Sequence, residues 1–197
     1  MAGRIVLSVG FYPHSQAQAH GEDVGCTPEQ KVRLDELHLR KIDLADEILV
    51  LDVGGYVGES TSREIVHAVK TGKPVRWLEP AHGSGILRRV LGSDEPRFMK
   101  LHADWIDGTS LMSFPHQMLQ HEAGREILDM GWAAVPLLLD AEPEWPVFAA
   151  LAVIVGWGPA PADVEGGFAK FSFDDVVRGW REWGLRQGFL TDVTATP

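Results

Sequence analysis

Residues 48–65 read ILVLDVGGYVGESTSREI, and they decide the fold that the sequence predicts. The apolar run from Ile48 to Val53 has the length and composition of a parallel strand that is covered on both faces. Glycines follow directly, and Ser60 and Thr61 supply N-caps for a helix that ends near Thr71. The stretch therefore predicts a strand, a glycine-rich turn and a helix, which is one repeat of a parallel α/β sheet.

The same alternation continues on both sides of this stretch. Ile5–Val9 is a short, mostly apolar run that predicts a buried strand, and Val75–Leu78 predicts another. Between the first two strands, residues 27–30 read TPEQ, which places Thr at an N-cap and Gln at the capping-box position of a helix. With right-handed crossovers, residues 1–80 are expected to form a short, doubly wound parallel sheet of Rossmann-like type.

The second half shows a different pattern. Residues 80–85 contain Pro, His, Ser and two Gly, and no clear strand pattern returns after them, so we place a domain boundary there. Segments 117–130, 133–140, 147–156 and 173–187 are predicted to be helical. We therefore expect an α/β domain over residues 1–80 and a small, mainly α-helical domain over residues 86–190.

Composition narrows the classes of partner and compartment. The chain has 197 residues, of which 28 are acidic and 18 are Lys or Arg, which gives a net charge of −10. This balance disfavours binding to polymeric nucleic acid or to anionic lipid. The only cysteine, Cys26, cannot form an intrachain disulfide, and the longest apolar stretch, Val147–Trp157, is far shorter than the roughly 20 residues of a membrane span. We expect a cytoplasmic protein without a membrane segment.

The glycine-rich turn is the natural place for a ligand. In open α/β sheets ligands bind beyond the carboxyl ends of the strands, and the free N–H groups of a helix start suit anionic or hydrogen-bonding groups. Glycines are equally needed just to reverse the chain, so the turn alone leaves a ligand site and a purely structural turn as alternatives.

A family resemblance bears on that choice. Residues 37–51 read LHLRKIDLADEILVL, residues 54–65 read GGYVGESTSREI, and residues 72–75 read GKPV. Together these segments resemble the nucleoside 2-deoxyribosyltransferase-like family, and more closely a bacterial branch of uncharacterised members. The resemblance covers roughly residues 3–80, and the combination of Ala-Asp-Glu-Ile with Gly-Glu-Ser-Thr-x-x-Glu-Ile is more specific than a glycine motif alone.

The resemblance implies a nucleophilic glutamate at Glu64. Its carboxylate would attack the anomeric carbon of a nucleoside to form a glycosyl ester, which a second base or water would release. The implied enzyme is a nucleoside deoxyribosyltransferase or an N-glycoside hydrolase, and it uses no cofactor. The alternative is structural, because Thr61 and Glu64 have capping-box spacing, and Glu64 would then only bind the Thr61 N–H.

The remaining candidates surround this glutamate. His38 stands where active relatives commonly carry Asp, and it is either a general acid or a surface or packing histidine. Glu59 either contacts the sugar or is solvated, and Tyr56 either stacks on a base or covers the sheet edge. The predicted catalytic residues are Glu64 and His38, and the predicted substrate-binding residues are Gly54, Gly55, Tyr56, Gly58, Glu59, Ser60 and Thr61.

The helical half is similar to a small helical domain of unassigned function found in bacterial and phage-like proteins, which implies no activity. Five of the seven tryptophans lie beyond residue 130, and we expect them in the core rather than on a stacking surface. His102, His116 and His121 lack tight metal-ligand spacing, so we expect no structural metal.

Two functions follow, because the chain also departs from the family. Relatives begin with an additional strand that lines the pocket, whereas Met1 falls just before the segment that resembles their second strand. Either the helical half or a second copy of the chain completes the pocket of an N-glycosidic enzyme, or the chain is a catalytically inactive nucleotide-binding or protein-interaction module. The expected partner is a small nucleoside or nucleotide, with a homo-oligomer as the means of completing the pocket.

Overall fold

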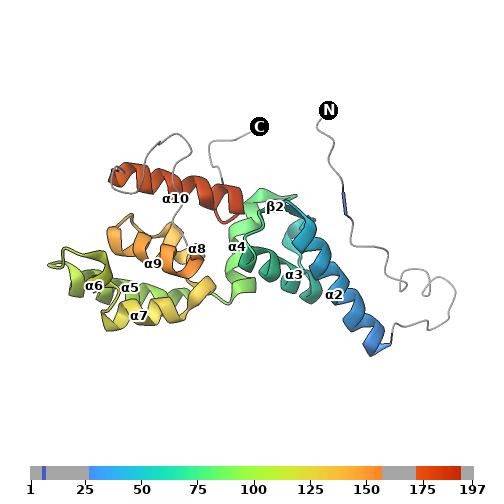
Figure 1. The fold of residues 1–197 in the computed structure, drawn as a ribbon, viewed down its shortest axis with the longest axis horizontal. Helices are drawn as coiled ribbons and strands as arrows, with labels where there is room; N and C mark the ends of the chain where they lie inside the picture. Colours follow the sequence, from blue (N-terminus) through green and yellow to red (C-terminus); the bar gives the residue numbers. More distant parts are fainter. Residues whose placement is uncertain (1–5, 8–26, 157–171, 192–197) are drawn as a thin grey trace.

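The computed structural model describes residues 6–7, 27–156 and 172–191, and helices dominate that part of the chain. In Figure 1, α5–α9 gather on one side and α2–α4 with the sheet on the other, and α10 runs from the first group to β2. The elements in chain order are α2 (Pro28–Leu44), β1 (Ile48–Val50), η1 (Val53–Gly55), α3 (Glu59–Lys70), β2 (Val75–Trp77), α4 (Pro80–Leu91), α5 (Glu95–Thr109), α6 (Pro115–Met118), α7 (Glu122–Asp129), η2 (Gly131–Ala133), α8 (Val135–Asp140), α9 (Trp145–Val155) and α10 (Phe173–Gln187).

The predicted doubly wound sheet is wrong for the residues described. Their sheet has two parallel strands, in which Ile48, Leu49 and Val50 lie opposite Val75, Arg76 and Trp77. The strand expected at residues 5–9 lies outside the described residues except for Val6 and Leu7, which belong to no strand. The fold is mostly helical, and not a Rossmann-like sheet followed by a helical domain.

The burial of the strand residues explains why the sequence predicted a larger sheet than the described residues form. Val50 is 4% exposed, but Leu49 is 60% and Leu51 68% exposed. The apolar run predicts a strand covered on both faces, whereas within the described residues only one face is covered. α3 contacts both α2 and α4, and α3 and α4 also contact β2. The pairing ends after Val50 because Asp52 and the glycine turn follow.

The start of α2 is confirmed in detail. The Thr27 Oγ1 accepts the N–H of Gln30 at 3.3 Å, and the Gln30 Oε1 accepts the N–H of Thr27 at 2.9 Å. This capping box satisfies two backbone donors that a helix start otherwise leaves unpaired.

Helix α4 crosses the expected domain boundary. Residues 80–85 form its first half, and α4 contacts β2 and α3 as well as α8 and η2. Gly83, which suggested a loop, serves packing instead, because a Cβ there would overlap the ring of Trp77. The buried side chains of both halves belong to one connected core that includes Ile42 and Phe189. The division into two domains at residues 80–85 stays a prediction.

The helical half contains its four predicted helical segments, and it also contains α5, which the sequence did not indicate. Helix α10 spans Phe173–Gln187 as expected, and the segments near 117–130, 133–140 and 147–156 form α6 to α9. Trp180 and Trp183 are buried as predicted, but Trp145 is 47% exposed. No helix within the described ranges is both long and apolar enough to cross a bilayer.

The carboxyl end of α10 closes onto β2. The indole Nε1 of Trp77 donates a hydrogen bond to the carbonyl oxygen of Gly188 at 3.2 Å. Gly188 has φ +80°, and a Cβ on it would overlap the carbonyl oxygen of Val75. This position therefore requires glycine both for its backbone angle and for the close approach of two backbones.

We expect V50D to destabilise the protein far more than L49D, since only Val50 would place an unpaired charge in the core. The loss should be about 3 kcal/mol or more for V50D and at most about 1 kcal/mol for L49D. Urea denaturation of both variants measures the difference. Equal losses would contradict the assignment of a covered and an open sheet face.

The two left-handed helix ends at Gly188 and Gly92 offer a second comparison. Both glycines cap a helix with positive φ, but a Cβ on Gly92 meets no atom within 4 Å. We expect G92A to cost about 1–2 kcal/mol from backbone strain alone, and G188A to cost about 2–5 kcal/mol because overpacking adds to the strain. Thermal unfolding of the two variants tests this order, and a smaller loss for G188A would contradict the described closure.

Candidate functional site

Helices α2 and α3 lie side by side and are joined by three polar pairs. Arg63 Nη2 lies 3.2 Å from Asp35 Oδ2, Glu64 Oε1 lies 3.1 Å from His38 Nδ1, and His67 Nε2 lies 2.7 Å from Asp43 Oδ1. The paired residues advance together along both helices, so the helices run parallel. Only the middle pair is largely buried, with His38 5% and Glu64 15% exposed.

The structure thus brings together the two predicted catalytic residues. His38 is not a surface residue, because its ring is enclosed between the helices, where its Nδ1 faces the carboxylate of Glu64. With the proton on Nδ1, the imidazole donates a hydrogen bond that fixes the orientation of Glu64. A carboxylate held in this way can act as a nucleophile or as a base.

The capping-box alternative for Glu64 is wrong. Helix α3 begins at Glu59 with Gly58 as N-cap, so neither Ser60 nor Thr61 is the N-cap that the sequence predicted. The reason is that Gly58 is extended and its carbonyl oxygen accepts both the N–H and the Oγ–H of Ser62. Glu64 consequently lies in the second turn of α3, and within the described chain its hydrogen bond goes to His38.

The glycine-rich turn has a defined geometry. Gly54 and Gly55 have φ +62° and +73°, a region that favours glycine, and η1 forms directly after Asp52. Their N–H groups are already used, since Gly54 donates to Glu79 Oε1 at 3.2 Å and Gly55 donates to the carbonyl of Asp52 at 2.7 Å. These two predicted binding residues therefore shape the turn rather than offer backbone donors.

The other predicted binding residues lie further along. Tyr56 is 77% exposed, and its hydroxyl lies close to Gly58, since a Cβ there would be 3.6 Å from it. Glu59 is exposed, and Ser60 and Thr61 are half-buried in the first turn of α3. Among the described residues no hydrogen bond occupies the N–H groups of these three residues, so donors for a ligand lie here.

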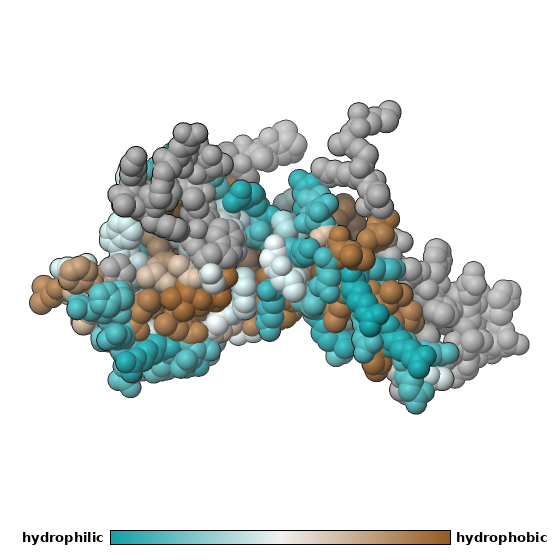
Figure 2. All heavy atoms as spheres, viewed as in Figure 1, coloured by the Kyte–Doolittle hydropathy of each residue, from teal (hydrophilic) through white to brown (hydrophobic). Residues whose placement is uncertain are grey.

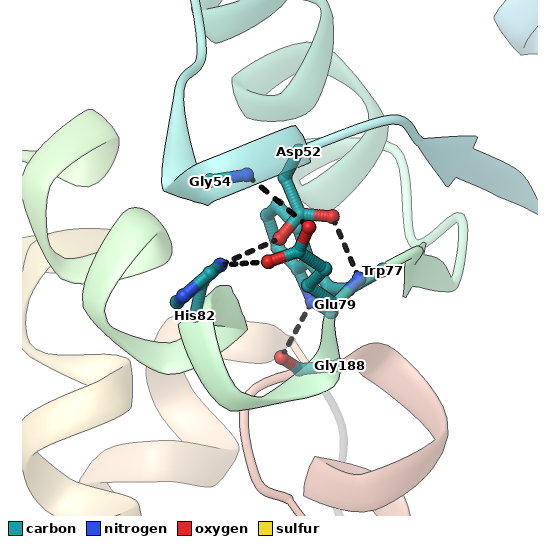
Figure 3. Close-up of polar contacts among 6 residues, drawn as sticks. All are labelled: Asp52, Gly54, Trp77, Glu79, His82 and Gly188. Atoms are coloured by element: carbon teal, nitrogen blue, oxygen red, sulfur yellow. Dashed lines mark hydrogen bonds and ion pairs between the residues drawn. The ribbon is translucent and has the colours of Figure 1, made fainter.

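A second polar cluster, which the sequence did not indicate, lies at the ends of the two strands (Figure 3). Asp52 is fully buried, and its Oδ1 accepts the N–H of Glu79 at 3.0 Å. His82 Nδ1 lies 3.2 Å from Glu79 Oε2 and 3.6 Å from Asp52 Oδ2. We call Asp52, Glu79 and His82 the strand-end cluster. The available signal was an acidic residue placed two positions after each strand.

The histidines of the helical half are scattered. His102 stacks on Phe98 with 5.5 Å between ring centroids, and burial lowers the pKa of its imidazole, an effect that Glu144 partly opposes. His121 lines a cavity of about 390 Å³ together with Arg97, Lys100 and Asp104. No set of three His, Cys, Asp or Glu side chains in the described ranges is arranged to hold a metal ion.

No family model, no curated protein and no solved structure matches the chain. The roles of Glu64 and His38 therefore rest on the motif resemblance and on the geometry of α2 and α3.

The buried His38–Glu64 pair should be coupled more strongly than the exposed His67–Asp43 pair, whose side chains are 28% and 51% exposed. Double-mutant cycles with H38N and E64Q, and with H67N and D43N as the matched control, measure the two couplings in urea. We expect about 1–3 kcal/mol for the buried pair and about 0.2–1 kcal/mol for the exposed pair. Equal couplings would contradict the buried contact.

Proposed function

We propose that the protein breaks the N-glycosidic bond of a small nucleoside or nucleotide, by hydrolysis or by deoxyribosyl transfer, with Glu64 as the nucleophile. The observation that carries this proposal is the Glu64 carboxylate itself. It makes no capping bond, it is largely buried, and His38 Nδ1 holds one of its oxygens at 3.1 Å.

This arrangement suits a double displacement. The Glu64 carboxylate attacks the anomeric carbon, the bond to the base nitrogen breaks, and a glycosyl ester forms; a water or a second base then releases the sugar. His38 contributes by positioning, since a hydrogen bond to one carboxylate oxygen leaves the other oxygen to attack. A buried location further restricts rotation of the glutamate side chain.

The surroundings of Glu64 support a polar, nucleoside-sized ligand. The first turn of α3 offers backbone donors for a phosphate or for hydroxyl groups, and the exposed Glu59 and Tyr56 lie at the same end of that helix. A carboxylate can accept hydrogen bonds from sugar hydroxyls, and a phenol ring can stack on a base.

A second candidate function is supported by a different surface. Leu49, Leu51 and Val53 are 60%, 68% and 67% exposed, which leaves an open apolar face beside the turn. Figure 2 shows hydrophobic surface next to the hydrophilic surface of α2. Such a face is typical of a protein contact, so an inactive interaction module is the alternative to the enzyme. Sedimentation of wild type and L51K distinguishes an assembling chain from a monomer.

Trapping with a 2-fluoro-2-deoxyribonucleoside tests the enzyme proposal directly. The fluorine destabilises the oxocarbenium-like transition state and lets the glycosyl ester accumulate, so mass spectrometry should find a glycosyl mass on the peptide that contains Glu64. E64Q should give no adduct and should release base at least about 10³-fold more slowly than wild type. The matched control is E36Q, which changes an exposed glutamate of the neighbouring helix α2 and should keep the adduct.

E64Q is expected to fold like wild type, because glutamine at position 64 retains an oxygen that accepts the hydrogen bond from His38. A loss of activity in E64Q then reports on chemistry and not on unfolding. Circular dichroism should therefore show the same fold for E64Q and wild type. Base release by E64Q at the wild-type rate would refute the nucleophile. Wild type that binds nucleosides without releasing base would favour the inactive module.

A further inference from the structure

We propose that His82 is the proton-transfer residue that protonates the departing base, and that the buried carboxylate of Asp52 positions it. This inference rests on the proposed glycosidic reaction and deepens it. It identifies the substrate class as nucleosides whose base leaves only with the help of a proton.

The first observation is the unsatisfied oxygen of Asp52. Its side chain is fully buried, and Oδ1 is hydrogen-bonded to the N–H of Glu79. Oδ2 has no hydrogen-bond partner among the described residues and lies 3.6 Å from His82 Nδ1, which is itself buried without a hydrogen bond. An unpaired buried carboxylate oxygen is costly, and a proton on His82 Nδ1 is the nearest donor that faces this oxygen.

The second observation is the orientation of the imidazole. In Figure 3 the carboxylates of Asp52 and Glu79 both face the same ring nitrogen, and the other ring nitrogen points away from them. Ionised carboxylates only accept hydrogen bonds, so they select the form of His82 in which Nδ1 carries the proton. The ring is 39% exposed, so a proton that Nε2 carries in the doubly protonated ring can pass to a ligand and later return.

The third observation is the position of the strand-end cluster. Asp52 and Glu79 follow β1 and β2 at the carboxyl edge of the sheet, where ligands of parallel sheets bind. The His82 ring packs against Gly55, where an added Cβ would lie 3.5 Å from it, and Glu79 holds the N–H of Gly54. His82 thus borders the turn that leads directly into α3, the helix of Glu64.

The proton balance of the reaction is complete with these groups. Glu64 forms a bond to the anomeric carbon, and the electron pair of the glycosidic bond passes to the base. The Nε2 proton of doubly protonated His82 moves to the base, which leaves His82 neutral with its remaining proton on Nδ1. In the second step water attacks the ester, its oxygen bonds to the anomeric carbon, Glu64 leaves as carboxylate, and the released proton returns to His82 Nε2.

The test compares two substrates whose bases differ in their need for a proton when they leave. One is the natural deoxynucleoside that wild type cleaves fastest among the four, and the other is 7-methyl-2′-deoxyguanosine, whose cationic base departs as a neutral molecule without a proton. H82Q should lower base release from the natural nucleoside by about 10²–10⁴-fold and change release from the methylated one only a few-fold. D52N should show the same selectivity, and E64Q should lose activity with both.

The control variant is H67Q, which changes a half-buried histidine of α3 outside the proposed machinery and should leave both rates unchanged. Added imidazole should restore base release to H82A but not to E64Q, a rescue that a purely structural role of His82 would not give. If H82Q lowers both rates equally, or neither, the role of His82 is refuted while the glycosidic function stands. If wild type releases base from none of these nucleosides, the glycosidic function fails and this inference fails with it.

Discussion

The hydrogen bond from the N–H of Glu79 to the buried carboxylate of Asp52 holds together the part of the fold on which the candidate site depends. The strands pair over only three residues, so few ladder hydrogen bonds join them. The Asp52 side chain extends the connection beyond the ladder, alongside the bond from the Leu78 N–H to the Val50 carbonyl. It thereby fixes where β1 ends, where the glycine turn begins and where α4 starts.

Trp77 connects this small sheet to the rest of the molecule. Its ring lies against Gly83 of α4, and its indole N–H binds the Gly188 carbonyl at the end of α10. Two glycines are therefore needed around one tryptophan, because any side chain at either position would overlap its neighbours. The sheet is covered on one face by its own helices and is closed at this point by a helix from the other half.

The sequence predicted correctly the helix features that depend on residues close together in the chain. The capping box at Thr27 and the range of α10 follow from side-chain hydrogen bonds and from helical spacing, and both are present. The extent of the sheet could not be predicted, because Leu49 and Leu51 are apolar yet exposed, so composition did not reveal which face is covered. Gly83 contributed to the wrong prediction of a loop at residues 80–85, since glycine is common both in loops and at close helix contacts.

The site was predictable in its residues but not in its contacts. Glu64 came from the motif resemblance and His38 from its position in the same motif, while their contact depends on how α2 and α3 pack. The strand-end cluster depends on three residues separated by up to 30 positions, and Asp52 was hidden inside an apolar run. Long-range placement of this kind is set by tertiary packing rather than by local pattern.

The contact between Trp77 and Gly188 spans 111 positions along the chain, and this separation has a consequence for biosynthesis. A chain emerging from the ribosome presents the sheet long before the residue that closes it. Contacts between distant positions also form late, because ordering the intervening chain costs entropy. The edge of Trp77 that binds Gly188 in the folded protein therefore stays without that partner until translation has passed α10.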